Sequence, residues 1–462
     1  MRPHEIAERI VAAGSAIGAG HTMALVTSTA SVNTRWARSA LTTNGHVERI
    51  EVAVIAVHDG PAGPQVAAIS RPADGLDPTE LASAALAQAR RSTPAWDAMP
   101  LPDASDAPPG PWSAPAGQLG TDDLRDALQR LGEEIAVDTA DGAEHFGYLE
   151  HSVASHWLAT SGGLALRYDQ PEARLEMNLK SHQRTRSTWN GFSGSDLAAA
   201  DIGGMAARAR TQLSWQARTL EVPPGRRTAI LSPSAVADLM IDLLHGADAR
   251  AAVEGRSAFS RPDGGTRLGE ALSTRGLRLY SDPAMPGQRG APFLLTSMSH
   301  DAASVFDNGL ALRSDDWIAD GRLQALVSSR AVAARSGLPL ALAPDNLCLD
   351  AAGCGDLDDL VARTADGLLV TCTWYNRMVD PQTHLITGLT RDGVYVVRDG
   401  EVVGRAGNYR FNDSPVSLLG RITDASAPVP ALGREMADYF TRTTMPAIVV
   451  DGFNLSSASE AV

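Results

Sequence analysis

The sequence has a single lysine, Lys180, so arginine supplies every other basic side chain. A P-loop needs a lysine between glycine and serine or threonine, whereas Lys180 follows Leu179, and this excludes P-loop nucleotide chemistry. A Schiff-base enzyme would also have to use Lys180. The alternating stretch 173–180 instead predicts that this lysine lies at the solvated end of a strand.

Cysteines are also few: Cys348, Cys354 and Cys372 are odd in number and form no CxxC pair. This pattern indicates free thiols in a reducing compartment rather than a disulfide framework or a metal cluster. Long apolar runs are lacking too, because Glu5 and Glu8 interrupt the N-terminal segment, which is neither a signal peptide nor a membrane span. We therefore expect a cytoplasmic protein without a membrane partner.

Positive charge is in deficit, with 40 basic against 54 acidic residues and a formal net charge of -14. Nucleic-acid binding normally needs a basic face that releases counterions, so this balance argues against a nucleic-acid partner. The 462 residues, 44% of them hydrophobic, suffice for two or more domains with their own cores.

The first half of the chain mixes helical and strand patterns. Asn44-Gly45 interrupts a β-branched block at 23–57 and predicts a hairpin there. The segment 93–120 is rich in proline and alanine and predicts an exposed loop. The other expected elements are helices at 3–18, 78–92, 121–138 and 201–217, and strands at 145–158, 163–169 and 173–182.

Two prolines and a glycine at 221–225 predict a domain junction. Beyond it, one helix at 233–245 precedes β segments that are separated by Asp-Gly and Asn-Gly turns. The sequence therefore predicts an α+β protein. Its N-terminal domain, 1–222, contains an antiparallel strand meander with helices, and its C-terminal domain, 223–462, is dominated by sheet.

Seven segments, in this order, resemble the TldD/TldE (PmbA) peptidase family over nearly the whole chain. They are 31–38, 254–260, 367–371, 374–381, 389–393, 399–404 and 408–412. No single segment is a catalytic signature, and the specificity comes from their succession.

The resemblance implies a chain of the TldE/PmbA type, which carries no zinc. TldD-like members of this family bind zinc through an HExxxH helix and a distant C-terminal cysteine. In an ungapped count from 257–260, that motif falls on residues 240–245, where Met240 and Ile241 replace the first histidine and the glutamate, and only His245 remains. A thioether is a poor zinc ligand and isoleucine cannot accept a proton. No cysteine follows Cys372, so we expect no cofactor in this chain and zinc in a partner subunit.

The function implied by the resemblance is that of a non-metal-binding subunit in a heteromeric TldD/TldE-type metallopeptidase. The partner would supply zinc and hydrolysis, and this chain would shape the cleft for peptides or unfolded segments. One alternative is the specialised processing of a peptide-derived natural product in a biosynthetic pathway, and another is a homo-oligomeric peptide-binding module without catalysis. In either a hetero- or a homodimer, we expect a large apolar interface on the C-terminal half.

Two groups of polar residues are candidate metal sites. Asp238, Asp242 and His245 share one face of the expected helix 233–245, where they are weak metal candidates. The alternative is the ordinary solvated face of a surface helix. The second group is made of three histidines, with two glutamates beside them, and contains Glu144, His145, Glu150, His151 and His156. If this segment is a strand, His151 and His156 point to opposite faces, which disfavours a metal site.

Aromatic and polar residues at 374–377 are the candidate substrate-binding site. Trp374, Tyr375, Asn376 and Arg377 follow an apolar strand and suit a cleft that receives an extended peptide by strand addition. The alternative is ordinary packing with one surface arginine. The glycine-rich stretches 191–195 and 264–269 match neither a nucleophile elbow nor a dinucleotide-binding loop, and we expect both to be turns.

Overall fold

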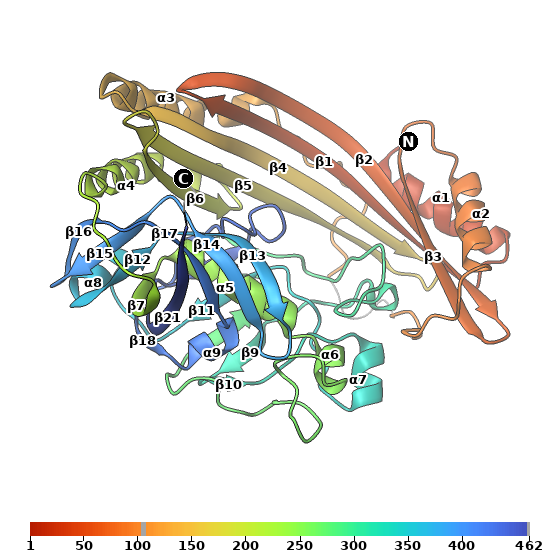
Figure 1. The fold of residues 1–462 in the computed structure, drawn as a ribbon. Coiled ribbons are helices and arrows are strands. Elements are labelled where there is room, and N and C mark those ends of the chain that lie inside the picture. The colour runs from red at the N-terminus through yellow and green to blue at the C-terminus, as the bar shows by residue number, and fades with distance from the viewer. Residues whose placement is uncertain (103–107, 460–462) are drawn as a thin grey trace.

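The computed structural model describes residues 1–102 and 108–459, which form three β-sheets with helices (Figure 1). The N-terminal sheet is antiparallel and contains only strands from the first half of the chain. Its order is β3 (Gly63–Pro72), β2 (Ala40–Gly60), β1 (His21–Ala37), β4 (Glu144–Thr160), β5 (Ala165–Ser181) and β6 (Arg186–Gly194). Figure 1 shows these long strands arching over the C-terminal half.

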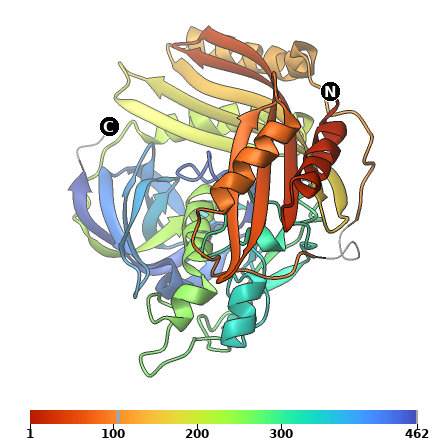
Figure 2. The ribbon, with the colours of Figure 1, turned by 90° about the vertical axis from the view of Figure 1, so that its right-hand side faces the viewer.

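Two pairs of helices cover the ends of this sheet. Figure 2 shows α1 (Pro3–Ala16) and α2 (Pro78–Ala89) side by side against one end. At the other end lie α3 (Arg125–Ala140), which follows a 3-10 turn at Thr121–Leu124, and α4 (Ile202–Trp215). Each pair buries an apolar cluster against the strands.

The N-terminal hairpin differs from the sequence prediction. The chain turns at Arg38 and Ser39, whose φ values are 54° and 59°, whereas Asn44 and Gly45 lie inside β2. Positive φ at both central residues is the geometry of a tight hairpin turn, and here two residues other than glycine adopt it. Gly45 has another role, because a Cβ there would come within 3.0 Å of the Asn33 side chain on β1.

Two further local predictions were wrong. The strands expected at 163–169 and 173–182 are one continuous strand, β5. Gly191 and Gly194 lie in β6, paired with Glu176 and Ala173, and not in a turn. Residues 93–102 and 108–120 form no helix or strand, and 103–107 lie outside the described residues.

The C-terminal half contains two sheets. One runs β13 (Thr373–Asp380), β14 (Leu385–Thr390), β17 (Asn408–Asp413), β21 (Ile448–Ser459), β7 (Gly225–Leu231), β12 (Asp366–Val370), β15 (Val394–Arg398) and β16 (Glu401–Arg405), with β18 (Ile422–Ala425) on β21. The other runs β10 (Arg322–Leu323), β9 (Asp315–Ala319), β8 (Arg278–Ser281), β11 (Leu347–Asp350), β20 (Thr443–Met445) and β19 (Val429–Ala431).

Helix α5 (Pro233–Gly246) contacts β7 and β13 of one sheet and β19 and β20 of the other, so the two sheets share one core around it. Besides this predicted helix, the C-terminal half contains short helices of five to seven residues. They are α6 (Ala249–Val253), α7 (Arg330–Ser336), α8 (Leu357–Ala362) and α9 (Pro415–Leu419). The mixed, sheet-rich α+β class predicted from the sequence is confirmed. Within the described residues, no helix has the length and apolarity needed to cross a membrane.

Candidate functional site

Helix α5 begins at a strong capping sequence. The Ser232 hydroxyl accepts the Ala235 N–H at 3.3 Å, and Pro233 occupies the first helical position, where its missing N–H costs nothing. Apolar side chains cover most of the helix circumference, as is typical of a buried helix.

The polar side of α5 is buried as well. Asp238 has 0% exposure and Asp242 is half-buried, whereas His245 is exposed. The interpretation of these residues as a solvated helix face was therefore wrong for Asp238 and Asp242, whereas it holds for His245. It failed because β13 and the segment 433–437 pack against this side, which the helix periodicity alone cannot reveal.

Asp238 accepts three hydrogen bonds, and no cationic side chain among the described residues pairs with it. Thr373 donates its hydroxyl to Oδ2 at 2.9 Å, and the backbone N–H groups of Glu435 and Met436 donate to Oδ1 at 3.0 and 3.1 Å. Burial raises the pKa of Asp238 to about 8, although these bonds favour the charged form. Gly433 leaves room for the carboxylate, since a Cβ there would lie 2.6 Å from Oδ1.

Asp242 lies one turn further along α5. Asn376 of β13 donates to Asp242 Oδ2 over 3.5 Å and to Thr373 Oγ1 over 3.2 Å. Burial raises the pKa of Asp242 to about 7. The chain of bonds from Asn376 through Thr373 to Asp238 thus joins β13 to both carboxylates of the helix.

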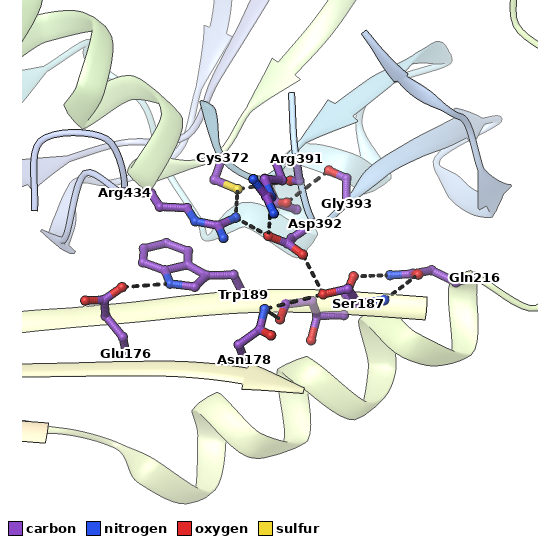
Figure 3. Close-up of polar contacts among 12 residues, drawn as sticks. Glu176, Asn178, Ser187, Trp189, Gln216, Cys372, Arg391, Asp392, Gly393 and Arg434 are labelled. Carbon is purple, nitrogen blue, oxygen red and sulfur yellow. Dashed lines mark hydrogen bonds and ion pairs between the residues drawn. The ribbon is translucent and has the colours of Figure 1, made fainter. Parts of the chain in front are cut away.

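The segment 433–437, which covers Asp238, is anchored on its other side by Arg434. The guanidinium contacts the Asp392 carboxylate and lies over the Trp189 ring at 5.3 Å (Figure 3). Ser187 on β6 donates its hydroxyl to the second oxygen of Asp392 at 2.5 Å. Burial alone would raise the pKa of Asp392, but Arg434 and Ser187 keep it lowered. Through this contact, the N-terminal sheet helps to hold the segment over α5.

Cys372 belongs to the same contact region and is a packed thiol. Its Sγ lies 3.2 Å from Arg434 and donates to the Arg391 carbonyl at 3.0 Å (Figure 3). Burial raises its pKa to about 11, so the thiolate nucleophile is disfavoured. Cys348 and Cys354 are also unpaired, as predicted.

The four predicted substrate-binding residues lie at an irregular point of β13, which is the edge strand of its sheet. The ladder to β14 is shifted between Trp374 and Arg377, where Tyr375 has φ 53°. Asn376 is buried toward α5, whereas Tyr375 is 53% exposed. Glu435 joins this point to the covering segment, because its carboxylate accepts the Tyr375 N–H at 2.8 Å and Arg377 at 2.9 Å.

The free edge of β13 continues with exposed apolar side chains. Met378 is 46% and Val379 56% exposed. An edge strand has unpaired backbone N–H and C=O groups, which can pair with an extended chain. The substrate-binding role of residues 374–377 stays a prediction.

A cavity of about 620 Å³ adjoins the end of β13 and the C-terminal end of α5. Its polar lining includes histidines and aspartates that the sequence analysis did not single out, and these are Asp248, His300, Asp301 and His384. No local sequence pattern links these positions, because they come from separate segments. The only local sign in the sequence is the glycine at position 246, because a Cβ there would overlap the His384 ring.

The histidines of β4 do not form a cluster. His145 is buried and bonds Asp138 at 2.5 Å, whereas His156 bonds Thr27 at 3.1 Å and stacks on Tyr168. A strand rises about 3.3 Å per residue, so these two histidines lie about 36 Å apart along β4. Across residues 1–102 and 108–459, no group of three or more His, Cys, Asp or Glu could hold a metal ion.

The zinc chemistry of the TldD-like pattern does not fit α5 either. Met240 and Ile241 are fully buried in the apolar core, and the oxygens of Asp238 accept bonds from the protein itself. A catalytic zinc site needs three protein ligands around an open position.

Comparison with solved structures shows the same fold across nearly the entire chain. TldE from Thermococcus kodakarensis matches with a TM-score of 0.78 and 16% identity, over 97% of this chain and 99% of that one. A protein from Thermotoga maritima described as a modulator of DNA gyrase matches with 0.77 and 15%, over 97% and 99%. A protein from Bacteroides thetaiotaomicron with the same description matches with 0.74 and 13%, over 98% of each chain.

A search of curated proteins found no significant match. The family model of the PmbA/TldA metallopeptidase C-terminal domain matches residues 224–457, which is half of the chain and includes α5, β13 and the segment 433–437. The chain therefore belongs to the TldD/TldE (PmbA) peptidase family.

Proposed function

We propose that this chain is the zinc-free subunit of a heteromeric TldD/TldE-type metallopeptidase that acts on peptides or unfolded segments in the cytoplasm. A TldD-like partner supplies the zinc and the hydrolytic step. This chain supplies one wall of the cleft, and β13 holds the peptide there.

The free edge of β13 is the observation that carries this proposal. The strand pairs with β14 on one side, and Tyr375, Met378 and Val379 are exposed along it. An extended peptide gains affinity from backbone hydrogen bonds to such an edge and specificity from neighbouring pockets. Asn376 and Glu435 hold β13 against α5 and the segment 433–437, so the edge is fixed before a peptide arrives.

The loss of zinc donors supports the assignment to the metal-free side of the pair. Asp238 and Asp242 of α5 are bonded to Thr373, Asn376 and backbone N–H groups instead of converging on an open coordination position. Such a helix can support the cleft wall but cannot activate water through zinc.

Exposed apolar side chains in the C-terminal half support a partner surface. Met298 is 65% and Tyr439 82% exposed, in addition to the edge of β13. An obligate interface buries on the order of 2,000 Å² or more and is largely apolar. Association should therefore persist at high salt, whereas a charge-steered encounter would weaken.

Co-expression with a candidate TldD-like chain that carries HExxxH and a C-terminal cysteine tests the proposal. We expect a stable complex at low and high salt, with about one zinc per complex, bound by the partner. The complex should cleave peptides, whereas this chain by itself should not. If this chain stays monomeric with and without the candidate, or if the isolated chain binds one zinc tightly, the proposal is wrong.

Val379→Lys tests the role of β13 within that complex. A lysine on a strand edge opposes pairing with another strand, so cleavage should fall while zinc content is kept. Leu340→Lys is the matched control, because Leu340 is also an exposed apolar residue, at 44%, and lies outside β13. Equal cleavage by the two variants would contradict peptide binding at this edge.

A further inference from the structure

The cavity beside β13 contains two buried acceptor atoms that the protein leaves without a partner. Among the described residues, neither His384 Nε2 nor Asp248 Oδ2 makes a hydrogen bond, and both side chains line the cavity. A buried polar atom without a partner is costly, so its presence needs an explanation such as a ligand.

His384 is held in place as a neutral acceptor. It lies in the turn between β13 and β14, is 1% exposed, and packs where Gly246 has no side chain. Burial lowers its pKa to about 4, so the ring is neutral at physiological pH. Nε2 is a ring nitrogen without a partner, and in the neutral tautomer with its proton on Nδ1 it offers a lone pair to a donor.

Asp248 also has one side-chain atom without a partner, a carboxylate oxygen. The residue is 7% exposed and caps α6, because Oδ1 accepts the Ala251 N–H at 2.6 Å. Oδ2 is the atom without a partner. One oxygen therefore has a structural role, and the other is available to a ligand.

The acidic side chains of the lining favour a cation. Asp242 and Asp248 form no ion pair with any described residue, whereas Asp301 pairs with Arg250 at 3.0 Å and Arg256 pairs with Glu254 at 2.5 Å. The Asp248 and His384 atoms without partners are acceptors, so a ligand must bring N–H or O–H groups of its own.

The size of the cavity and its side chains favour an organic cation over a metal ion. About 620 Å³ is the volume of a small-molecule site, far more than one ion fills. The described residues also contain no group of ligands that could hold a metal ion. The ligand class that fits is an organic cation with several N–H donors.

We propose that this cavity binds the ammonium or guanidinium group of a peptide through Asp248 Oδ2 and His384 Nε2. Met378 lies both on the free edge of β13 and in the cavity lining, so a peptide that extends β13 can place a cationic group there. This inference rests on the proposed peptide binding at β13 and adds a substrate preference to it. The cation can be the peptide N-terminus or a lysine or arginine side chain.

Calorimetry on the full-length chain, with its partner where one co-purifies, tests the site. n-Butylammonium chloride and n-butanol are the first probes and need no peptide binding, so they separate this inference from the proposed function. We expect n-butylammonium to bind about tenfold more tightly, as one charged hydrogen-bonded contact allows. Equal affinity for the two probes, or no binding of either, would overturn the inference.

Three blocked or unblocked pentapeptides identify the source of the cation. The first has a central lysine and an acetylated N-terminus, the second has norleucine and an acetylated N-terminus, and the third has norleucine and a free N-terminus. Tighter binding of the first assigns the site to a side chain, and tighter binding of the third assigns it to the N-terminus. If all three peptides bind equally while n-butylammonium binds, the cavity does bind a cation. The inference that a peptide on β13 supplies that cation is then wrong.

Asp248→Asn is the decisive variant, because asparagine can keep the α6 cap through its oxygen while the charge is lost. The preference for n-butylammonium should fall from about tenfold to less than about threefold. Asp77→Asn is the matched control, since Asp77 caps α2 in the N-terminal domain in the same manner. A preference that survives in Asp248→Asn, or stoichiometric zinc that Asp248→Asn and His384→Phe abolish, would overturn the inference.

Discussion

Two buried aspartates hold the same short segment in opposite ways. Asp392 holds 433–437 through the guanidinium of Arg434, whereas Asp238 holds it through the N–H groups of Glu435 and Met436 (Figure 3 shows the Asp392 side). Their pKa values move in opposite directions, lowered for Asp392 and raised to about 8 for Asp238.

The difference shows that burial by itself does not decide the state of a carboxylate. Both residues are largely removed from water, and burial opposes the charged form of each. Asp392 has a cation in contact and keeps its charge, whereas Asp238 has neutral donors only. The segment over α5 is therefore anchored ionically on one side and by a titratable group on the other.

The largest expected effect is that of Asp392→Asn. This change leaves the Arg434 guanidinium, whose side chain is 12% exposed, without its carboxylate. Loss of one partner from a buried ion pair costs about 3 kcal/mol or more of unfolding free energy. Urea denaturation measures it. Asp263→Asn, in an exposed loop, is the control and should change stability by less than about 0.5 kcal/mol. Similar losses in the two variants would contradict the ionic anchor.

The second prediction concerns pH and Asp238. Its pKa rises from 3.8 in the unfolded chain to about 8 in the fold, so the native state retains a proton that the unfolded state has lost. The contribution to stability is complete below pH 3.8 and is lost as pH rises toward 8. The advantage of the wild type over Asp238→Asn should therefore fall by roughly 2 kcal/mol between about pH 5.5 and pH 7.

Parallel urea titrations of the wild type and Asp238→Asn at several pH values check this. Asp242, whose pKa is raised to about 7, changes stability in the same direction and is present in both proteins, so the comparison reports Asp238 together with its repulsion from Asp242. The contribution of Asp392, whose pKa is lowered, is lost in acid instead. A difference that does not vary with pH would show that Asp238 stays ionised.

The third prediction concerns the space beside Asp238. Gly433→Ala places a Cβ 2.6 Å from Oδ1 and 3.2 Å from the Asp238 backbone nitrogen, so the segment must move. Overpacking of this kind costs about 1–2 kcal/mol. Gly407→Ala is the matched control, since nothing lies within 4 Å of a Cβ there. Thermal unfolding should separate the two variants, and equal midpoints would contradict the close approach of 433 to Asp238.

The smallest stability effect is expected at Tyr375, where a substitution should lower peptide affinity but leave the free energy of unfolding nearly unchanged. Asparagine tolerates the left-handed backbone, with φ 53° here, and the side chain is 53% exposed, so Tyr375→Asn should change stability by less than about 0.5 kcal/mol. Peptide affinity should nevertheless fall about fivefold through the lost aromatic contact. Unchanged affinity in fluorescence anisotropy would remove Tyr375 from the peptide site.

Local sequence signals predicted elements better than they predicted the surroundings of those elements. Helix α5 was predicted from its apolar periodicity, but its polar side was assigned to solvent. Asn44-Gly45 predicted a hairpin turn, but the turn lies at Arg38 and Ser39. The glycine at position 45 instead allows the Asn33 side chain of the neighbouring strand to come close. Both errors concern contacts with residues that are distant in the sequence.

By itself, the sequence determined the α+β class, the helix predicted at 233–245, the free thiols and the family. The class, the helix and the thiols follow from periodicity, spacing and composition, which are local or summed over the chain, whereas the family followed from the resemblance of seven ordered segments. Only the tertiary structure decided that Asp238 is buried without a cation, and that His384 and Asp248 meet in one cavity. The physical reason is that solvation and hydrogen-bond partners depend on which distant segments pack together, and no local pattern in the chain encodes that packing.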